Sequence, residues 1–171
     1  ARRLLSAAGS DARIVAKIER SEAIPRLDEI VQASDAVMVA RGDLGIEVGY
    51  AELTGLQKHI LQVARKHDRV TITATQMMES MIQSPVPTRA EVSDVANAVL
   101  DGSDAVMLSG ESAVGKYPVR AVEAMSEVIV GAEKYQIARN IRGERFEGRV
   151  SEFAQAIAHA VMYTANHMAV E

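Results

Sequence analysis

The sequence lacks cysteine altogether, and it has neither a long apolar run nor an excess of basic residues. Without cysteine, the 171-residue chain can form no disulfide framework, no thiolate metal site and no cysteine nucleophile. Its apolar runs are far shorter than the roughly 20 residues that span a bilayer. The net charge of −4 gives no basic footprint for nucleic acid. These absences fit a cytoplasmic globular protein with neither nucleic acid nor membrane as its partner.

Four short apolar runs each end in a small polar cluster and are followed by a segment with helical patterning. The runs lie at 14–19, 36–43, 70–76 and 105–111. Successive strand–helix units predict an α/β fold with a parallel sheet, in which all strands point the same way. The polar ends of the strands then meet at one edge of the sheet, where α/β enzymes place their chemistry. The side chains expected to converge there are Lys17, Glu19, Asp43, Thr75, Ser109 and Glu111.

Helix signals lie between and after these runs. Ser21 is a candidate N-cap, and Thr88 with Glu91 forms the pattern of a capping box. Gly9 follows what resembles the last turns of a helix, so we expect the chain to be a piece of something longer. A final helix is expected from Ser151 toward His167, after a polar stretch.

Four strand–helix units form either a small open sheet or one half of an eight-stranded barrel, whose usual length is about 250 residues. A half barrel leaves two edge strands unpaired, which favours association. We assign residues 1–139 to the barrel, 140–150 to a linker and 151–171 to the first helix of a C-terminal α/β domain.

Lys17 and Glu19 stand two residues apart on a predicted strand, so both side chains point to the same face. Asp43, which follows Gly42, could bring a second carboxylate beside them. Two carboxylates without a His or Cys pattern suit Mg²⁺ or Mn²⁺. A nearby lysine would stabilise negative charge on a phosphoryl or enolate oxygen. The alternative is a structural ion pair between Lys17 and Glu19, and spacing alone does not decide between the two.

Two other patterns are interpreted as structural. Gly110–Lys116 is close to a phosphate-binding loop, but Tyr117 stands where that loop needs Ser or Thr to hold Mg²⁺. We therefore interpret it as a strand-to-helix turn. Met77, Met78 and Met81 have helical spacing and are expected to pack in the core.

Several runs resemble pyruvate kinase in order and spacing, and the resemblance covers nearly the whole chain. The matching runs are Lys17-Ile18-Glu19, Met38 to Gly45 (MVARGDLG), Ala74 to Met81 (ATQMMESM), Pro87 to Glu91 (PTRAE), Asp94 to Gly102 (DVANAVLDG) and Met107 to Glu111 (MLSGE). The resemblance implies a TIM-type barrel enzyme of glycolysis that transfers a phosphoryl group from phosphoenolpyruvate to ADP, giving pyruvate and ATP.

The resemblance also implies residue roles. Glu19 and Asp43 would hold Mg²⁺ or Mn²⁺, and Lys17 would stabilise charge on the phosphoryl group and the enolate oxygen. The backbone at Gly42 and Asp43 would contact the substrate carboxylate. Thr75 would contact the substrate and help protonate the enolate carbon, with Ser109 and Glu111 as further candidates nearby.

The resemblance covers strands five to eight of the barrel and the opening helix of the C-terminal domain. The other half would carry arginine contacts to the phosphoryl group, a K⁺ site and much of the nucleotide site. The family also implies a homo-oligomer, with tetramers expected.

Two hypotheses follow: the metal-binding half of a pyruvate kinase, or a catalytically incomplete half barrel that self-associates. A third is an Mg²⁺-dependent barrel aldolase or mutase, which would turn over without nucleotide.

Overall fold

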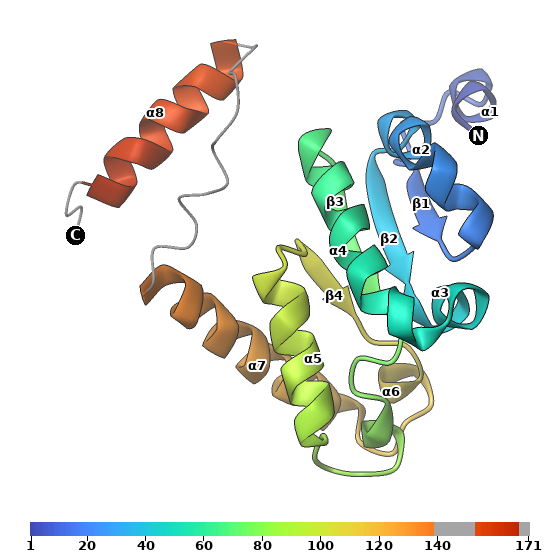
Figure 1. The fold of residues 1–171 in the computed structure, drawn as a ribbon, viewed down its shortest axis with the longest axis vertical. Coiled ribbons are helices and arrows are strands. Elements are labelled where there is room, and N and C mark those ends of the chain that lie inside the picture. Colours follow the sequence, from blue (N-terminus) through green and yellow to red (C-terminus); the bar gives the residue numbers. More distant parts are fainter. Residues whose placement is uncertain (139–152, 168–171) are drawn as a thin grey trace. The chain divides into compact units, whose positions relative to one another are not determined.

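Four strands form a single parallel sheet in the order β1-β2-β3-β4 (Figure 1). They are β1 (Val15–Ile18), β2 (Ala36–Ala40), β3 (Val70–Ala74) and β4 (Ala105–Met107). Each strand lies beside the next one in the chain, and every pairing is parallel. The predicted parallel α/β fold is therefore confirmed.

The computed structural model describes residues 1–138 and 153–167. Two compact units divide the chain, Ala1–Lys134 and Tyr135–Glu171, and all four strands belong to the first. The helices are α1 (Arg2–Ala7), η1 (Ser21–Arg26), α2 (Leu27–Ala33), α3 (Arg41–Val48), α4 (Tyr50–Lys66), η2 (Glu79–Ile82), α5 (Arg89–Leu100), α6 (Gly110–Ala113), α7 (Pro118–Ala138) and α8 (Phe153–His167), where η marks a 3-10 helix.

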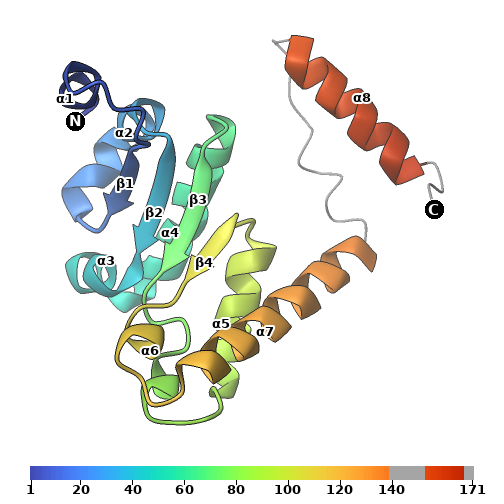
Figure 2. The same ribbon diagram turned by 180° about the vertical axis from the view of Figure 1, so that it is seen from behind.

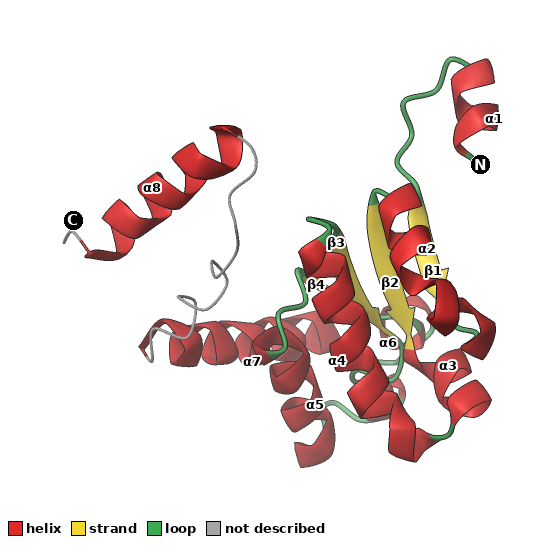
Figure 3. Cartoon of the chain, turned by 45° about the horizontal axis from the view of Figure 1, so that its top comes forward, coloured by secondary structure: helices red, strands yellow, loops and turns green. Residues whose placement is uncertain are grey.

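Helices α2 and α4 cover one face of the sheet. In Figure 1, α4 lies in front of the strands, and after the half turn of Figure 2 the strands lie in front of it. Figure 3 colours the strands yellow and shows them side by side with α4 across them. In Figure 2 no described helix crosses the opposite face of β1, β2 and β3.

Two apolar clusters form the core of the first unit. One joins β1 and β2 to α2, α3 and α4, with Val37, Val39, Leu44 and Ile60 fully buried. The other joins the segment after β3 to α5 and α7 and is rich in methionine. Met77, Met78, Met81 and Met125 are its largest members, which confirms that these methionines pack in the core.

Of the two predicted helix caps, one is confirmed and the other is wrong. The Thr88 side chain accepts from the Glu91 amide, and Glu91 accepts from the Thr88 amide, so the predicted capping box is confirmed. Ser21 is not an N-cap: it is the first residue of η1, and its hydroxyl donates to Glu47 at 3.1 Å. Helix α3, which follows β2 at once, was not predicted.

An aspartate precedes β2 and β4, within an identical sequence, Ser-Asp-Ala-Val-Met, at 34–38 and 103–107. Asp35 accepts a hydrogen bond from the Ile14 amide at 2.8 Å, and Asp104 accepts from the Thr71 amide at 2.9 Å. Each carboxylate therefore joins the start of its own strand to the start of the preceding strand in the sheet. The hydrogen bond from the Ile14 amide lowers the pKa of Asp35 below its ordinary value and outweighs burial, which by itself would raise that pKa.

In the second unit, α8 carries the apolar residues expected of the final helix, which the sequence placed from Ser151. The predicted linker at 140–150 lies outside the described residues, so the proposed domain boundaries stay a prediction. In the described part of the chain, no helix has the length and apolar character needed to cross a membrane.

Candidate active site

The predicted site residues lie where the strands end and the next segments begin. Lys17 lies in β1, and Glu19 is the first residue after that strand. Gly42 and Asp43 occupy the first turn of α3, and Thr75 comes immediately after β3. All four strands are parallel, so these positions share one edge of the sheet, marked in Figure 1 by α3 and α6.

Lys17 joins two carboxylates that come from different strand ends. Its ammonium forms a close ion pair with Glu19 and lies 3.4 Å from the Asp43 carboxylate. The hydrogen bond to Glu19 raises the pKa of Lys17, and the bond to Asp43 acts in the same direction. The three side chains are partly open to solvent, since Glu19 is 35% and Asp43 61% exposed. The structure therefore brings together three residues that the sequence spread over 27 positions.

The chemistry of this group suits a hard divalent cation. Its donors are carboxylate oxygens, the ligands that Mg²⁺ and Mn²⁺ prefer, and a cationic side chain already lies between them. Within residues 1–138 and 153–167, no three His, Asp or Glu side chains are grouped to hold a metal. A cation at Glu19 and Asp43 would thus complete its coordination with water and ligand oxygens.

Thr75 contacts the start of α3 through its side chain. The Gly42 amide donates to the Thr75 hydroxyl at 2.8 Å, and that hydroxyl donates to the Ala74 carbonyl at 2.7 Å. Thr75 and Gln76 have φ of 68° and 53°, the left-handed conformation that non-glycine residues seldom adopt. A strained backbone at the carboxyl end of a strand is frequent at functional sites.

Arg41 holds this left-handed turn through hydrogen bonds from its guanidinium. The side chain is 5% exposed, and its guanidinium donates to the Thr75 carbonyl at 2.8 Å and to the Gln76 carbonyl at 2.9 Å. On its other side it forms an ion pair with Asp94 of α5 at 2.7 Å. Sequence reasoning assigned no role to Arg41 or Asp94. The available signal was an arginine placed directly after an apolar strand, where a charge needs a partner to be buried.

Ser109 and Glu111 belong to a neighbouring group. Glu111 is 2% exposed, and its carboxylate accepts from the Ser109 amide at 2.8 Å and the Met78 amide at 3.1 Å. Glu111 thus ties the start of α6 to the segment after β3. The Ser109 amide donates to Glu111 and its carbonyl accepts from the Ser112 hydroxyl, so Ser109 is bonded within this neighbouring group and not to the group around Lys17.

A family model, related sequences and a solved structure all match this chain to pyruvate kinases. A family model described as "Pyruvate kinase, barrel domain" matches residues 1–122. The chain is 58% identical over 163 residues to a pyruvate kinase of Buchnera aphidicola subsp. Baizongia pistaciae, covering 94% of this chain and 34% of that protein. It is 56% identical over 171 residues to pyruvate kinase II of Salmonella typhimurium, covering 98% of this chain and 35% of that protein.

A solved structure agrees. The crystal structure of a pyruvate kinase from Cryptosporidium parvum matches with a TM-score of 0.82 and 43% identity, over 91% of this chain and 32% of that one. The chain therefore spans about a third of the length of the relatives it matches. A family model that covers most of the chain, high identity and a shared fold lead to one conclusion: this chain belongs to the pyruvate kinase family.

Proposed function

We propose that this chain is the metal-binding half of a pyruvate kinase catalytic barrel, corresponding to strands five to eight. Its function is then Mg²⁺-dependent phosphoryl transfer from phosphoenolpyruvate to ADP, in the cytoplasm and as the final step of glycolysis. The observation that carries the proposal is Lys17 placed between Glu19 and Asp43 at the carboxyl edge of a parallel sheet. Helices α2 and α4 on a single face of the sheet also suit a barrel wall.

In this proposal Glu19 and Asp43 hold Mg²⁺ or Mn²⁺, which neutralises charge on the oxygens of the substrate. The Lys17 ammonium adds positive charge where the enolate oxygen becomes negative as its bond to phosphorus breaks. The backbone at Gly42 and Asp43 contacts the substrate carboxylate at the start of α3, where the helix dipole favours an anion. Thr75, hydrogen-bonded to the Gly42 amide, contacts the substrate and helps a proton reach the enolate carbon. Ser109 is a further candidate nearby.

The rest of the catalytic machinery then lies elsewhere. The chain spans about a third of its relatives, so the arginine contacts to the phosphoryl group, a K⁺ site and much of the ADP/ATP site would come from outside this segment. A homotetramer is the assembly that the family suggests. A second candidate function, a catalytically incomplete half barrel that self-associates, is favoured by the edge strands β1 and β4.

The direct test is Mn²⁺ binding to the full chain, measured by electron paramagnetic resonance with and without oxalate, an enolate-like dianion. We expect oxalate to tighten Mn²⁺ binding, and we expect Glu19→Gln to weaken it at least about tenfold, because one of two charged ligands is lost. Glu22→Gln, which removes an exposed carboxylate paired with Arg20, should bind as the wild type does. A folded wild-type chain that binds no Mn²⁺ would rule out an autonomous metal site and favour the structural alternative.

A further inference from the structure

The left-handed turn at Thr75 and Gln76 needs a compensating interaction. Threonine is β-branched, and neither residue type adopts positive φ without steric cost, about 1–2 kcal/mol per residue. Both carbonyls of the turn point at the same group, the Arg41 guanidinium, which donates to Thr75 from Nε and Nη2 and to Gln76 from Nη2. Planar, rigidly arranged N–H donors suit this double contact, which a lysine ammonium cannot reproduce.

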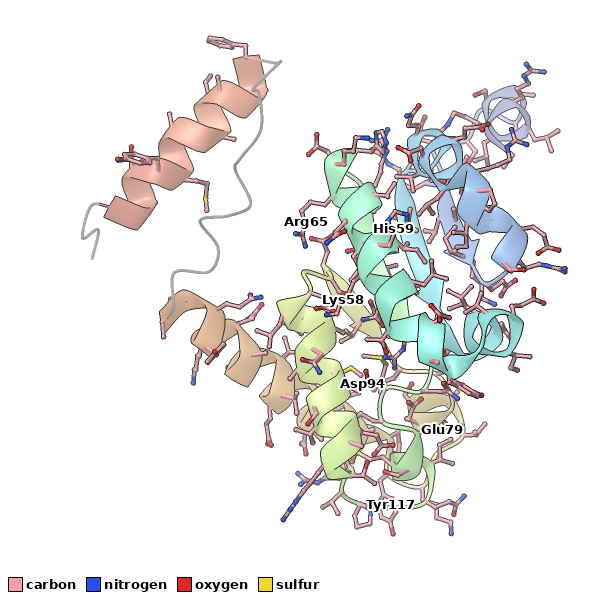
Figure 4. All side chains as sticks on the ribbon, viewed as in Figure 1. Lys58, His59, Arg65, Glu79, Asp94 and Tyr117 are labelled. Carbon is pink, nitrogen blue, oxygen red and sulfur yellow. The ribbon has the colours of Figure 1, made fainter. Side chains whose placement is uncertain are left out.

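Arg41 is itself held by a residue outside the edge of the sheet. Its Nη1 atom pairs with Asp94, which lies on α5 and is 42% exposed. Figure 4 labels Asp94 on α5 and Lys58 on α4, and a pocket of about 490 Å³ is lined by residues of both helices, including Asp94, Lys58 and Asp101. Arg41 as a residue is only 5% exposed, and a buried guanidinium requires a charged partner, so Asp94 restricts where the Arg41 side chain can lie.

We propose that Arg41 and Asp94 act as a positioning pair: Asp94 orients the Arg41 guanidinium, which holds the Thr75–Gln76 turn and so keeps the Thr75 hydroxyl at the Gly42 amide. Neither residue need touch the substrate, since their effect passes through the turn. Only the link from Thr75 to substrate binding rests on the proposed function. The conformational part stands on the contacts themselves.

The test is nuclear magnetic resonance on the full chain, comparing wild type with Arg41→Lys and Asp94→Asn. We expect the ¹³C shifts of Thr75 and Gln76 to move away from left-handed values in both variants. The Gly42 amide should exchange with solvent about threefold to tenfold faster, because its bond to Thr75 loosens. Asp101→Asn is the matched control, since Asp101 lines the same pocket and pairs with Lys58 rather than Arg41.

A second variant tests the cause. Glycine adopts positive φ without steric cost, so Gln76→Gly should restore slow Gly42 exchange in the Arg41→Lys chain by at least half. If Arg41→Lys does not fold, Asp94→Asn decides, because its side chain is half exposed. Unchanged Thr75 and Gln76 shifts with Gly42 exchange within twofold of wild type in Asp94→Asn would overturn the proposal. An equal change in Asp101→Asn would overturn it as well.

The consequence for binding is measured separately. In Asp94→Asn we expect Mn²⁺ alone to bind within twofold of wild type, and its enhancement by oxalate to fall about threefold to tenfold. Full enhancement despite a moved turn would overturn the functional part of the proposal. A wild-type chain that binds no Mn²⁺ would count against the proposed function, while the resonance data would still decide whether Arg41 and Asp94 hold the turn.

Discussion

Gly42 is a residue at which a substitution can change ligand binding without lowering the stability of the fold. A Cβ built at this position would lie 3.5 Å from the Thr75 hydroxyl, an ordinary contact. Because Gly42 is in the first turn of α3 and its φ is not positive, alanine suits the backbone. A methyl group would nevertheless lie beside Thr75 and on the residue whose backbone is proposed to contact the substrate carboxylate.

We therefore predict that Gly42→Ala folds as well as the wild type, with a free energy of unfolding equal or up to about 1 kcal/mol higher, because alanine has the higher helix propensity. The same variant should lose most of the oxalate enhancement of Mn²⁺ binding. Urea unfolding and Mn²⁺ titration measure the two effects.

The matched control is Gly55→Ala in α4, where a Cβ meets nothing within 4 Å. It should give the gain in stability without any loss of oxalate enhancement. Oxalate enhancement at the wild-type level in Gly42→Ala would show that the ligand does not approach this backbone.

What could be predicted about the site depended on how near its residues are in sequence. Lys17 and Glu19 are two positions apart on a strand, so period-two geometry was enough to place them on one face. Arg41 meets Thr75 and Asp94 only through tertiary folding, and no local pattern encodes those contacts. The left-handed turn was equally hidden, because threonine and glutamine are residues that ordinarily argue against positive φ.

At the scale of elements, Glu91 joins α5 to the segment after β3. Its carboxylate accepts from the amide and hydroxyl of Ser80 and from those of Thr88. Burial by itself would raise the pKa of Glu91, but these hydrogen bonds outweigh it and hold the pKa below its ordinary value of 4.5. A carboxyl with a lowered pKa stabilises the folded state above its unfolded pKa, and this contribution is lost as pH falls through the folded pKa.

We predict that Glu91→Gln lowers the free energy of unfolding by about 1 kcal/mol at pH 7, because the charged acceptor of the capping box is lost. The difference from wild type should shrink as pH falls from 4.5 through the lower pKa of the folded Glu91 carboxyl, because that carboxyl is then protonated. Urea unfolding at a series of pH values measures it.

Glu123→Gln is the control for this experiment, because Glu123 forms an i,i+3 ion pair with Arg120 on the exposed face of α7. Pairs of this kind contribute about 0.3–0.5 kcal/mol. A Glu91→Gln deficit that stays constant from neutral pH to pH 3 would contradict the assigned role of its charge.

Elements with a clear apolar pattern were predictable, even where they are as short as β4, whereas α3 was not. All four strands and the helices α4, α5 and α7 follow clear patterns, and the structure has each of them. Helix α3 has eight residues, two of them glycine, so it offers too little helical periodicity to stand out after an apolar strand. The segment Ser21–Arg26, where a helix was expected to begin with Ser21 as its N-cap, is the 3-10 helix η1, which contains Pro25 and has no side-chain cap.

For the whole molecule, the important feature is a sheet that does not close within the described residues. β1 and β4 are its edge strands, and Val15 of β1 is 45% exposed. Edge strands present unpaired backbone groups that can pair with another chain. We predict that the isolated chain self-associates across a concentration series in sedimentation equilibrium.

Lysine on both edges should weaken this association at least about tenfold, which corresponds to about 1.4 kcal/mol, because charge on an edge strand opposes pairing. The variant is Val15→Lys combined with Ala105→Lys. Val114→Lys adds one such lysine at a side chain that is 78% exposed but lies outside the strands, and it should associate as the wild type does. A monodisperse monomer at every concentration would contradict the prediction.

The two aspartates at the strand starts have a consequence for how this architecture tolerates change. Asp35 and Asp104 fasten neighbouring strands at the end of the sheet opposite Lys17 and Thr75. A slip of one residue in register would turn every side chain of a strand to the other face, and these bonds oppose it. The register of the strands therefore does not depend on the residues at the candidate site. Substitutions there can change what the site binds while the strands keep their alignment.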